Sequence, residues 1–151
     1  MVARRAASRA IRPALSSGRV FVDTNVFAYA LDRSAGAKQA RAQEVIRARR
    51  HDIVVSTQVL IELHAVCTSK LGMPRSDARA AVESISGFPV TDTDRSLVLR
   101  AVALAERAEL SVFDAAIVCA AQRAACRAIL TEDLNDGQRF GDTVVENPFA
   151  G

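Results

Sequence analysis

Short apolar runs alternate along the chain with longer segments of helical spacing. The runs are rich in Val and Ile, which is typical of buried strands. Strands that alternate with helices predict parallel βαβ units and an α/β fold, here a three-layer α/β/α sandwich with a mostly parallel sheet. The expected strands are 20–23, 53–55, 88–90 (the weakest), 128–131 and 143–145, and the expected helices are 26–31, 34–50, 56–71, 75–85, 94–108 and 112–127.

Polar and helix-breaking residues mark the ends of the expected helices. Thr24 and Asn25 precede the first helix, and Ser34 and Ser56 precede the next two. Side chains of this kind accept hydrogen bonds from the free amides of a first helical turn, so we expect them to be N-caps. Gly72 is expected to end the third helix.

Two of the apolar runs lead into acidic residues. Asp23 follows the run 20–22, and Asp133 follows the run 128–131 after one further acid, Glu132. The carboxyl ends of parallel strands are where open α/β sheets bind ligands. If the two strands are neighbours, we expect Asp23 and Asp133 to emerge at the same edge of the sheet.

Two further acids interrupt the apolar stripes of expected helices. Glu62 lies on a stripe with Val59 and Val66, and Asp114 lies on a stripe with Ile117. Burying a lone carboxylate costs several kcal/mol unless it is paired, protonated or bound to metal. Structural explanations stay open for both: Glu62 could pair with an arginine or lie near a helix end, and Asp114 could be a first-turn acid that favours a helix N-terminus.

The composition is that of one domain with a substantial core. The chain has 151 residues, half of them hydrophobic, and no apolar run approaches the roughly 20 residues that span a bilayer. We therefore expect no membrane segment and a cytoplasmic protein. Cys67, Cys119 and Cys126 are odd in number and lie in apolar helical segments, which favours buried free thiols over disulfides or a zinc site.

The net charge of +3 comes from the start of the chain. Residues 1–19 hold five arginines and no acid, so the remaining chain has 15 basic and 17 acidic residues, a net charge of −2. We therefore divide the chain into a basic N-terminal extension, 1–18, and a domain, 19–151. The extension is interpreted as a disordered segment or misassigned start, or else as an arm that contacts nucleic-acid phosphates.

Four carboxylates that converge at one edge would repel one another, and their pKa values would rise. Hard divalent cations relieve this repulsion, and Mg²⁺ and Mn²⁺ prefer such oxygen ligands. The chemistry of such a site is metal-assisted hydrolysis of phosphodiesters. No Cys/His spacing indicates zinc, and no glycine-rich phosphate loop indicates nucleotide-driven phosphoryl transfer.

Four motifs in order, with compatible spacing, resemble the PIN-domain nucleases. They are the Val-Asp-Thr-Asn-Val of 22–26, the helix start at 56–62, the segment 111–118 and the segment 130–138. More narrowly, the chain resembles the VapC toxins of bacterial toxin–antitoxin pairs from about residue 19 to Phe149. The extension 1–18 departs from that family, whose members commonly start near the first strand.

The resemblance implies an endoribonuclease that depends on Mg²⁺ or Mn²⁺ and cleaves single-stranded or looped RNA. It also implies a VapB-type antitoxin that covers the acidic site, and a homodimer. The catalytic and metal-holding acids would be Asp23, Glu62, Asp114 and Asp133, the polar helpers Thr24, Asn25 and Thr131, and a supporting outer acid Asp136.

Two other functions stay open. The same fold could be an RNA- or protein-binding module with a weak or silent site, although repulsion between retained acids argues against this. A DNA-directed flap nuclease would share the acidic chemistry, but this chain is short for extra DNA-clamping elements. A basic helix segment is interpreted either as RNA phosphate contacts or as a solvated face; its residues are Lys38, Arg41, Arg47, Arg49 and Arg50.

Overall fold

The computed structural model describes residues 18–151, which form one mixed sheet with helices on both sides. The basic extension expected at 1–18 lies, as far as residue 17, outside the described residues. The strands are β1 (Val20–Val22), β2 (Ile53–Ser56), β3 (Val90–Thr91), β4 (Ala128–Leu130), β5 (Arg139–Phe140) and β6 (Thr143–Glu146), and the helices are α1 (Thr24–Leu31), α2 (Ala37–Arg49), α3 (Thr57–Ser69), α4 (Arg75–Ile85), α5 (Arg95–Ala108) and α6 (Val112–Arg123).

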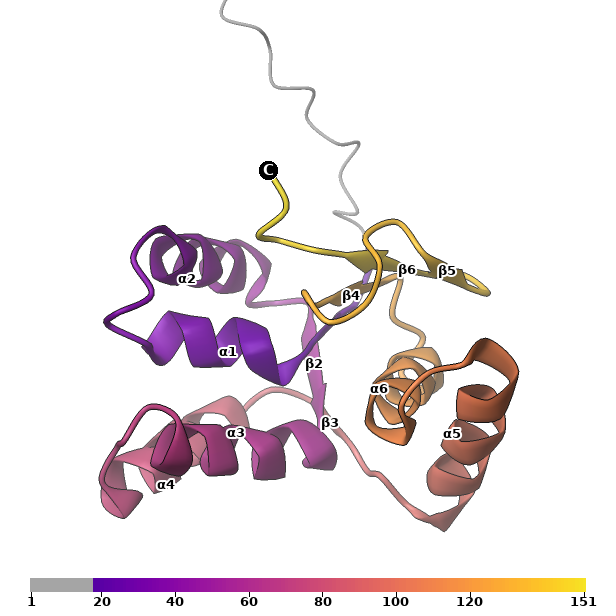
Figure 1. Ribbon diagram of the computed structural model, residues 1–151, viewed down its shortest axis with the longest axis horizontal. Helices are drawn as coiled ribbons and strands as arrows, with labels where there is room; N and C mark the ends of the chain where they lie inside the picture. Colours follow the sequence, from indigo (N-terminus) through magenta and orange to yellow (C-terminus); the bar gives the residue numbers. More distant parts are fainter. Residues whose placement is uncertain (1–17) are drawn as a thin grey trace, which may run out of the picture.

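The sheet has the strand order β3-β2-β1-β4-β6-β5, and every pair except β5 with β6 is parallel. β1 is central, and Val22 lies in register with Leu130 of β4. Helices α1 to α4 cover one face, and α5 and α6 cover the other (Figure 1). The expected three-layer α/β/α sandwich with a mostly parallel sheet is confirmed.

The core forms where the central strands meet these helices. Every residue of β1, β2 and β4 is buried, as expected for strands that are covered on both faces. In α6 the run Ala115–Ala121 is buried throughout, because this helix lies between the sheet and α5 (Figure 1). The three cysteines are buried free thiols, as the sequence predicted.

Helix boundaries are the main errors of the sequence prediction. Ser34 does not cap α2: its backbone amide and hydroxyl both donate to Asp32 Oδ1, and the helix begins only after Gly36. Gly36 has a φ of 59°, a left-handed conformation that costs glycine little. The helix expected at 112–127 ends at Arg123, because the chain turns at Ala125, whose φ is 54°.

The outer strands also differ from the prediction. The weak strand expected at 88–90 is a two-residue strand, Val90–Thr91, beside β2. The antiparallel strand β5 was not predicted, since two residues carry no periodicity. No helix in 18–151 is both long and apolar enough to cross a bilayer.

Candidate functional site

Asp23 leaves the carboxyl end of β1 and is almost completely buried, with 4% of its surface exposed. It is itself the N-cap of α1, because its Oδ1 accepts from the backbone amide of Thr24 at 2.7 Å. The expected caps Thr24 and Asn25 are therefore the first residues of the helix instead. Asp23 Oδ2 accepts from Thr131 Oγ1 at 2.8 Å, across the β1–β4 pair.

Burial raises the pKa of Asp23 from 3.8 to about 7. Removal of water from the carboxylate is the largest cause, and the hydrogen bonds from Thr131 and Thr24 oppose it. The charges of Asp133 and Glu62 raise the pKa further. The site therefore holds a carboxylate whose charge the protein alone leaves poorly compensated near neutral pH.

Glu62 reaches Asp23's surroundings from α3. Its Oε2 accepts from Thr24 Oγ1 at 2.9 Å, and its Oε1 accepts from Gln58 Nε2 at 2.8 Å. The same Gln58 amide donates to the backbone carbonyl of Phe113 at 3.1 Å. Gln58 thus ties Glu62 to the residue immediately before Asp114.

Asp133 lies in the loop that follows β4, and hydrogen bonds with Asn25 and Thr131 fix its position. Asn25 Nδ2 donates to Asp133 Oδ2 at 3.1 Å and to Thr131 Oγ1 at 3.0 Å. The backbone amide of Asp133 donates to Thr131 Oγ1, and that of Glu132 donates to Asn25 Oδ1. The polar helpers Thr24, Asn25 and Thr131 therefore all bond to the acids or to the loop that carries them.

Asp114 enters from the opposite helix layer, in the first turn of α6. Its backbone amide donates to the N-cap Ser111 at 3.1 Å. Burial raises the pKa of Asp114, the side chain of Ser111 opposes this, and the charges of Asp133 and Glu62 raise it further. Because Asp133 and Glu62 act on both Asp23 and Asp114, the four predicted acids share one electrostatic environment at the carboxyl edge of the sheet.

The acids do not form a ready-made metal cage. In residues 18–151 no three His, Cys, Asp or Glu side chains are grouped closely enough to hold an ion. Glu62 instead bonds Thr24 and Gln58, and Asp133 bonds Asn25. The donor chemistry nevertheless fits a hard cation, because carboxylates beside hydroxyl and amide oxygens are the ligands that Mg²⁺ and Mn²⁺ prefer.

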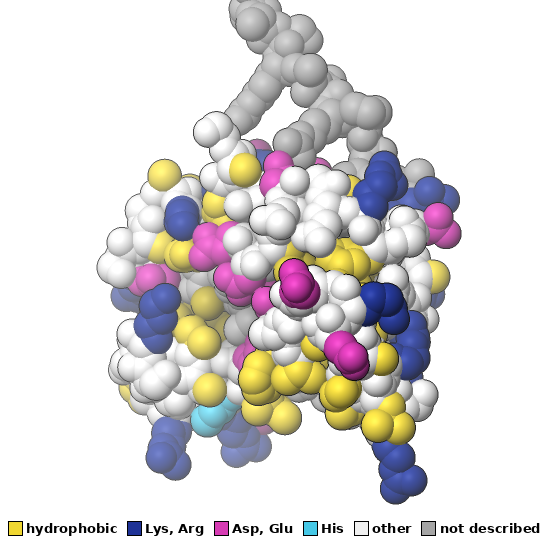
Figure 2. All heavy atoms as spheres, turned by 45° about the vertical axis from the view of Figure 1, so that its right-hand side comes forward, with side chains coloured by type: hydrophobic (Ala, Val, Ile, Leu, Met, Phe, Trp, Pro, Cys, Tyr) yellow, Lys and Arg dark blue, Asp and Glu magenta, His cyan; other side chains and the backbone are white. Residues whose placement is uncertain are grey.

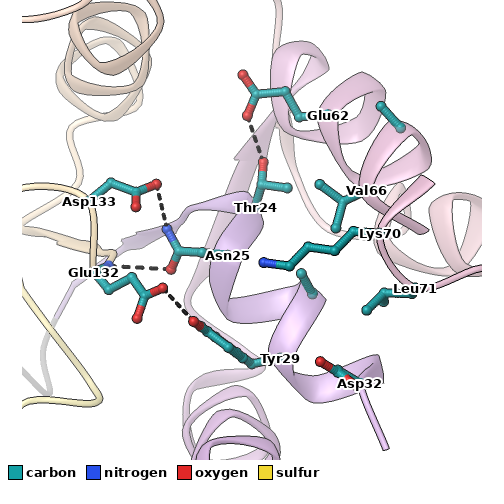
Figure 3. A pocket seen from close by; sticks show the side chains of 12 residues that line it. Thr24, Asn25, Tyr29, Asp32, Glu62, Val66, Lys70, Leu71, Glu132 and Asp133 are labelled. Carbon is teal, nitrogen blue, oxygen red and sulfur yellow. Dashed lines mark hydrogen bonds between the residues drawn. The ribbon is translucent and has the colours of Figure 1, made fainter. Parts of the chain in front are cut away.

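A pocket of about 400 Å³ opens beside the acids, between α1, α3 and the loop after β4. Thr24, Asn25, Glu62 and Asp133 line its acidic end (Figure 3). Neither Asp23 nor Asp114 lines it. The remaining wall is formed by Ala28, Tyr29, Asp32, Ala65, Val66, Lys70, Leu71 and Glu132.

None of the five basic residues proposed to contact RNA lines this pocket. The ammonium of Lys38 is engaged within the protein, at 3.1 Å from Glu132 Oε2 and 4.6 Å from the ring centre of Tyr29. Arg41 Nε donates to the carbonyl of Pro148 at 2.9 Å, and its guanidinium pairs with Glu44. Arg47, Arg49 and Arg50 lie at the far end of α2 or just beyond it, and their RNA contacts stay a prediction.

Asp136 does not line the pocket, and its Oδ1 accepts from the backbone amide of Asn147 at 2.9 Å. This bond joins the loop after β4 to the segment after β6.

Sequence reasoning missed Gln58, Tyr29, Lys70 and Glu132 as residues of the site. Only Glu132 carried a signal, as the neighbour of Asp133 in the same motif.

The sequence profile of the PIN domain matches residues 20–139, most of the chain. The chain belongs to the PIN-domain family. The predicted resemblance is thereby confirmed. Sequence comparison with curated proteins finds no match.

Solved structures of similar fold include several toxins and their complexes. Mycobacterium tuberculosis VapC20, described as a sarcin–ricin loop cleaving toxin, has a TM-score of 0.65 and 19% identity over 76% of this chain and 91% of its own. A toxin–antitoxin complex from Klebsiella pneumoniae has a TM-score of 0.64 and 21% identity over 86% and 98% of the two chains. Rickettsia felis VapBC2, bound to a DNA fragment from its promoter, has a TM-score of 0.59 and 19% identity, over 85% of this chain and 97% of its own. At these identities the likeness shows that this PIN domain has the VapC fold.

Proposed function

We propose that this PIN domain is a toxin of the VapC type, a Mg²⁺- or Mn²⁺-dependent endoribonuclease that an antitoxin neutralises. The observation that carries the proposal is the buried carboxylate of Asp23 at the carboxyl end of β1. Burial and the charges of Asp133 and Glu62 raise its pKa, and the same two acids also act on Asp114. Such a group is costly for folding unless a cation binds beside it. Ionisable groups whose pKa values are strongly shifted by burial and by neighbouring charges are found most often at functional sites.

The chain's own residues have separate tasks in the proposed reaction. Asp23, Asp114 and Asp133 would hold the cation, and Glu62 would complete the cluster or orient the attacking water. A bound divalent cation supplies activation of water and stabilisation of the leaving oxygen. Asn25 keeps the carboxylate of Asp133 in place, and Thr24 does so for Glu62. No side chain is needed as a nucleophile.

The direct test uses the full chain, purified free of any antitoxin, with total RNA as substrate. We expect discrete fragments with Mg²⁺ or Mn²⁺ and none with EDTA, and sequencing of the new RNA ends identifies the substrate and the position of the cut. Asp114→Asn is expected to remove the activity. If no RNA is cut in either cation, the enzyme reading fails and the binding-module alternative is favoured.

Gln58 offers a test of how the acids are positioned. Gln58→Leu keeps the side-chain volume but removes the bonds to Glu62 and to the Phe113 carbonyl. Residues that orient metal-binding acids typically contribute 10- to 100-fold, so we expect Mn²⁺ affinity and RNA cleavage both to fall about tenfold. His64→Ala, an exposed change on the same helix, serves as the control. Unchanged Mn²⁺ affinity, measured by calorimetry, would contradict the role of Gln58.

The proposed partner is a VapB-type antitoxin that covers the acidic pocket, as toxin–antitoxin complexes occur among the structural relatives. The proposed compartment is the cytoplasm, where its RNA substrates lie. Co-expression tests this: a neighbouring gene whose product binds the toxin is expected to restore growth. A toxin that remains harmful in the presence of every such neighbour would contradict this part of the proposal.

The proposed homodimer has a candidate surface. Large apolar side chains are exposed on α5, on the first turn of α6 and on α3, with Ile61 exposed by 73%, Phe113 by 66% and Leu99 by 64%. Figure 2 shows hydrophobic side chains grouped beside acidic ones on this side of the molecule. Exposed apolar clusters favour protein contacts. Leu99→Asp is therefore expected to shift the protein to monomers in sedimentation equilibrium, and a wild-type monomer would contradict the homodimer.

A further inference from the structure

The pocket beside the acids has a strongly asymmetric lining. Four acids line it, with Glu62 and Asp133 at one end and Asp32 and Glu132 elsewhere in the wall, and Lys70 is the single basic residue among the lining residues. The backbone amide of Lys70 donates to the carbonyl of Val66, but its side chain has neither a hydrogen bond nor an ion pair with any residue of 18–151. That side chain extends across the pocket toward Asn25 (Figure 3). A cation is therefore presented to the pocket without a partner of opposite charge in contact with it.

Asp32, an acid of the pocket lining on which the charge of Lys70 acts, already bonds to other groups. Asp32 Oδ1 accepts from the hydroxyl and backbone amide of Ser34. These bonds, more than the charge of Lys70, lower the pKa of Asp32. The ammonium of Lys70 thus remains available to an anion that enters the pocket.

The wall between the two ends is apolar and fixed. Ala28, Ala65, Val66 and Leu71 line it, together with the ring of Tyr29. Two hydrogen bonds fix the side chain of Tyr29: its hydroxyl donates to Glu132 at 2.6 Å and accepts from Lys38 at 3.2 Å. The volume of about 400 Å³ lies within the range of small-molecule sites, about 300–1,000 Å³.

We propose that this pocket binds the nucleotide next to the phosphodiester that is cut, with Lys70 on a flanking phosphate and the apolar wall against the ribose and base. The proposal rests on the proposed function, since it takes Glu62 and Asp133 to mark the place of the scissile phosphate. Lys70 follows Glu62 by eight residues, about 12 Å along the helix axis, and lysine side chains lean toward the helix N-terminus. RNA that leaves the acids along α3 therefore meets the pocket and then Lys70.

Single-stranded nucleic acid is the class of ligand that fits both halves of the pocket. Phosphate groups bind basic side chains that have no ion-pair partner, and unpaired bases pack against apolar and aromatic side chains. In a duplex the bases are stacked and paired, so they could not pack against the apolar wall of the pocket. The pocket therefore favours an unpaired segment over a helical one.

The test measures RNA binding without cleavage, in EDTA, so that it does not depend on the metal-assisted reaction. The probe is a fluorescein-labelled, single-stranded RNA decamer of mixed sequence, and its anisotropy is followed from 50 to 300 mM salt, roughly the range in which phosphate contacts are screened. Lys70→Ala is expected to weaken binding several-fold and to reduce the slope of log K against log salt by about 0.7, the value of one phosphate contact on a single strand. Lys70→Arg should restore the slope.

Further variants separate the contribution of the apolar wall to RNA binding from that of the charge of Lys70. Ala65→Leu fills the pocket and should weaken binding while leaving the salt slope unchanged, whereas Ala80→Leu on the exposed face of α4 should change neither. Arg79→Ala removes an exposed cation outside the pocket and serves as the charge control. The proposal is overturned if Lys70→Ala behaves like Arg79→Ala, or if a duplex of the same sequence binds as well as the single strand. Cleavage that fails while these binding differences appear would refute the nuclease and leave the pocket as an RNA site.

Discussion

Asp23→Asn is expected to raise the free energy of unfolding of the metal-free protein at pH 8 by about 2 kcal/mol, while RNA cleavage in the presence of Mn²⁺ falls on the order of 100-fold. The two effects have opposite signs because the same charge that would hold a cation is expensive to bury without one. A residue needed only for folding would lose stability and activity together. The opposite signs therefore identify Asp23 as a functional group.

The size of the stability gain follows from the pKa. Folding raises the pKa of Asp23 from 3.8 to about 7, and each unit corresponds to about 1.4 kcal/mol, so burying the charge costs on the order of 4 kcal/mol above pH 7. Asparagine removes that cost and keeps the N-cap, because its oxygen can still accept from Thr24. Its amide group, however, would meet the donors Thr131 and Asn25, which reduces the expected gain.

The sign of the pH dependence is fixed by proton uptake. Between about pH 4 and 7 the folded protein binds a proton at Asp23 that the unfolded chain does not, so its stability falls as pH rises through this window. Urea unfolding of the wild type in EDTA at pH 5 and pH 8 should show this fall. Asp23→Asn should lack this contribution, and Asp142→Asn, an exposed change before β6, should behave as the wild type. Parallel pH profiles for Asp23→Asn and the wild type would contradict the buried charge.

The sequence was sufficient to locate Asp23 because local signals coincide there. An apolar run predicted β1, and the abrupt change to an acid placed that acid at the carboxyl edge of the sheet. Asp133 followed from the same reasoning at β4, whose pairing with β1 puts Val22 opposite Leu130. Both inferences depend only on the neighbouring residues and on the geometry of parallel strands.

The contacts that orient the acids could not be predicted, because they join residues far apart in the chain. Gln58 bonds Glu62 one turn later, but its second bond goes to Phe113, 55 residues away. Tyr29 meets Glu132 across 103 residues. Nothing in the local pattern distinguishes these side chains from other polar residues on helix surfaces. The start of α2 was missed for a related reason, since Ser34 bonds Asp32 and thereby forms a turn before the helix.

Mn²⁺ is expected to stabilise the folded protein strongly at pH 8 and much less at pH 6. A cation that binds only the folded state at 100 times its Kd adds about 2.7 kcal/mol. At pH 8 Asp23 is already ionised, but below its pKa of about 7 a cation must displace the proton. The apparent affinity should therefore fall about tenfold for each pH unit below 7, if Asp23 is a ligand.

The measurement is the melting temperature with and without Mn²⁺ at the two pH values, together with calorimetry of Mn²⁺ binding. Asp23→Asn should lose most of the Mn²⁺-induced rise and nearly all of its pH dependence, whereas Asp142→Asn should retain both. A rise that is equal in Asp23→Asn and wild type would place the cation elsewhere. A wild type that binds no Mn²⁺ would leave the buried charge of Asp23 without a ligand, and the nuclease proposal would then lose its chemical basis. The buried carboxylate thus joins folding to function: the cation that would support cleavage would also offset the cost of burying Asp23.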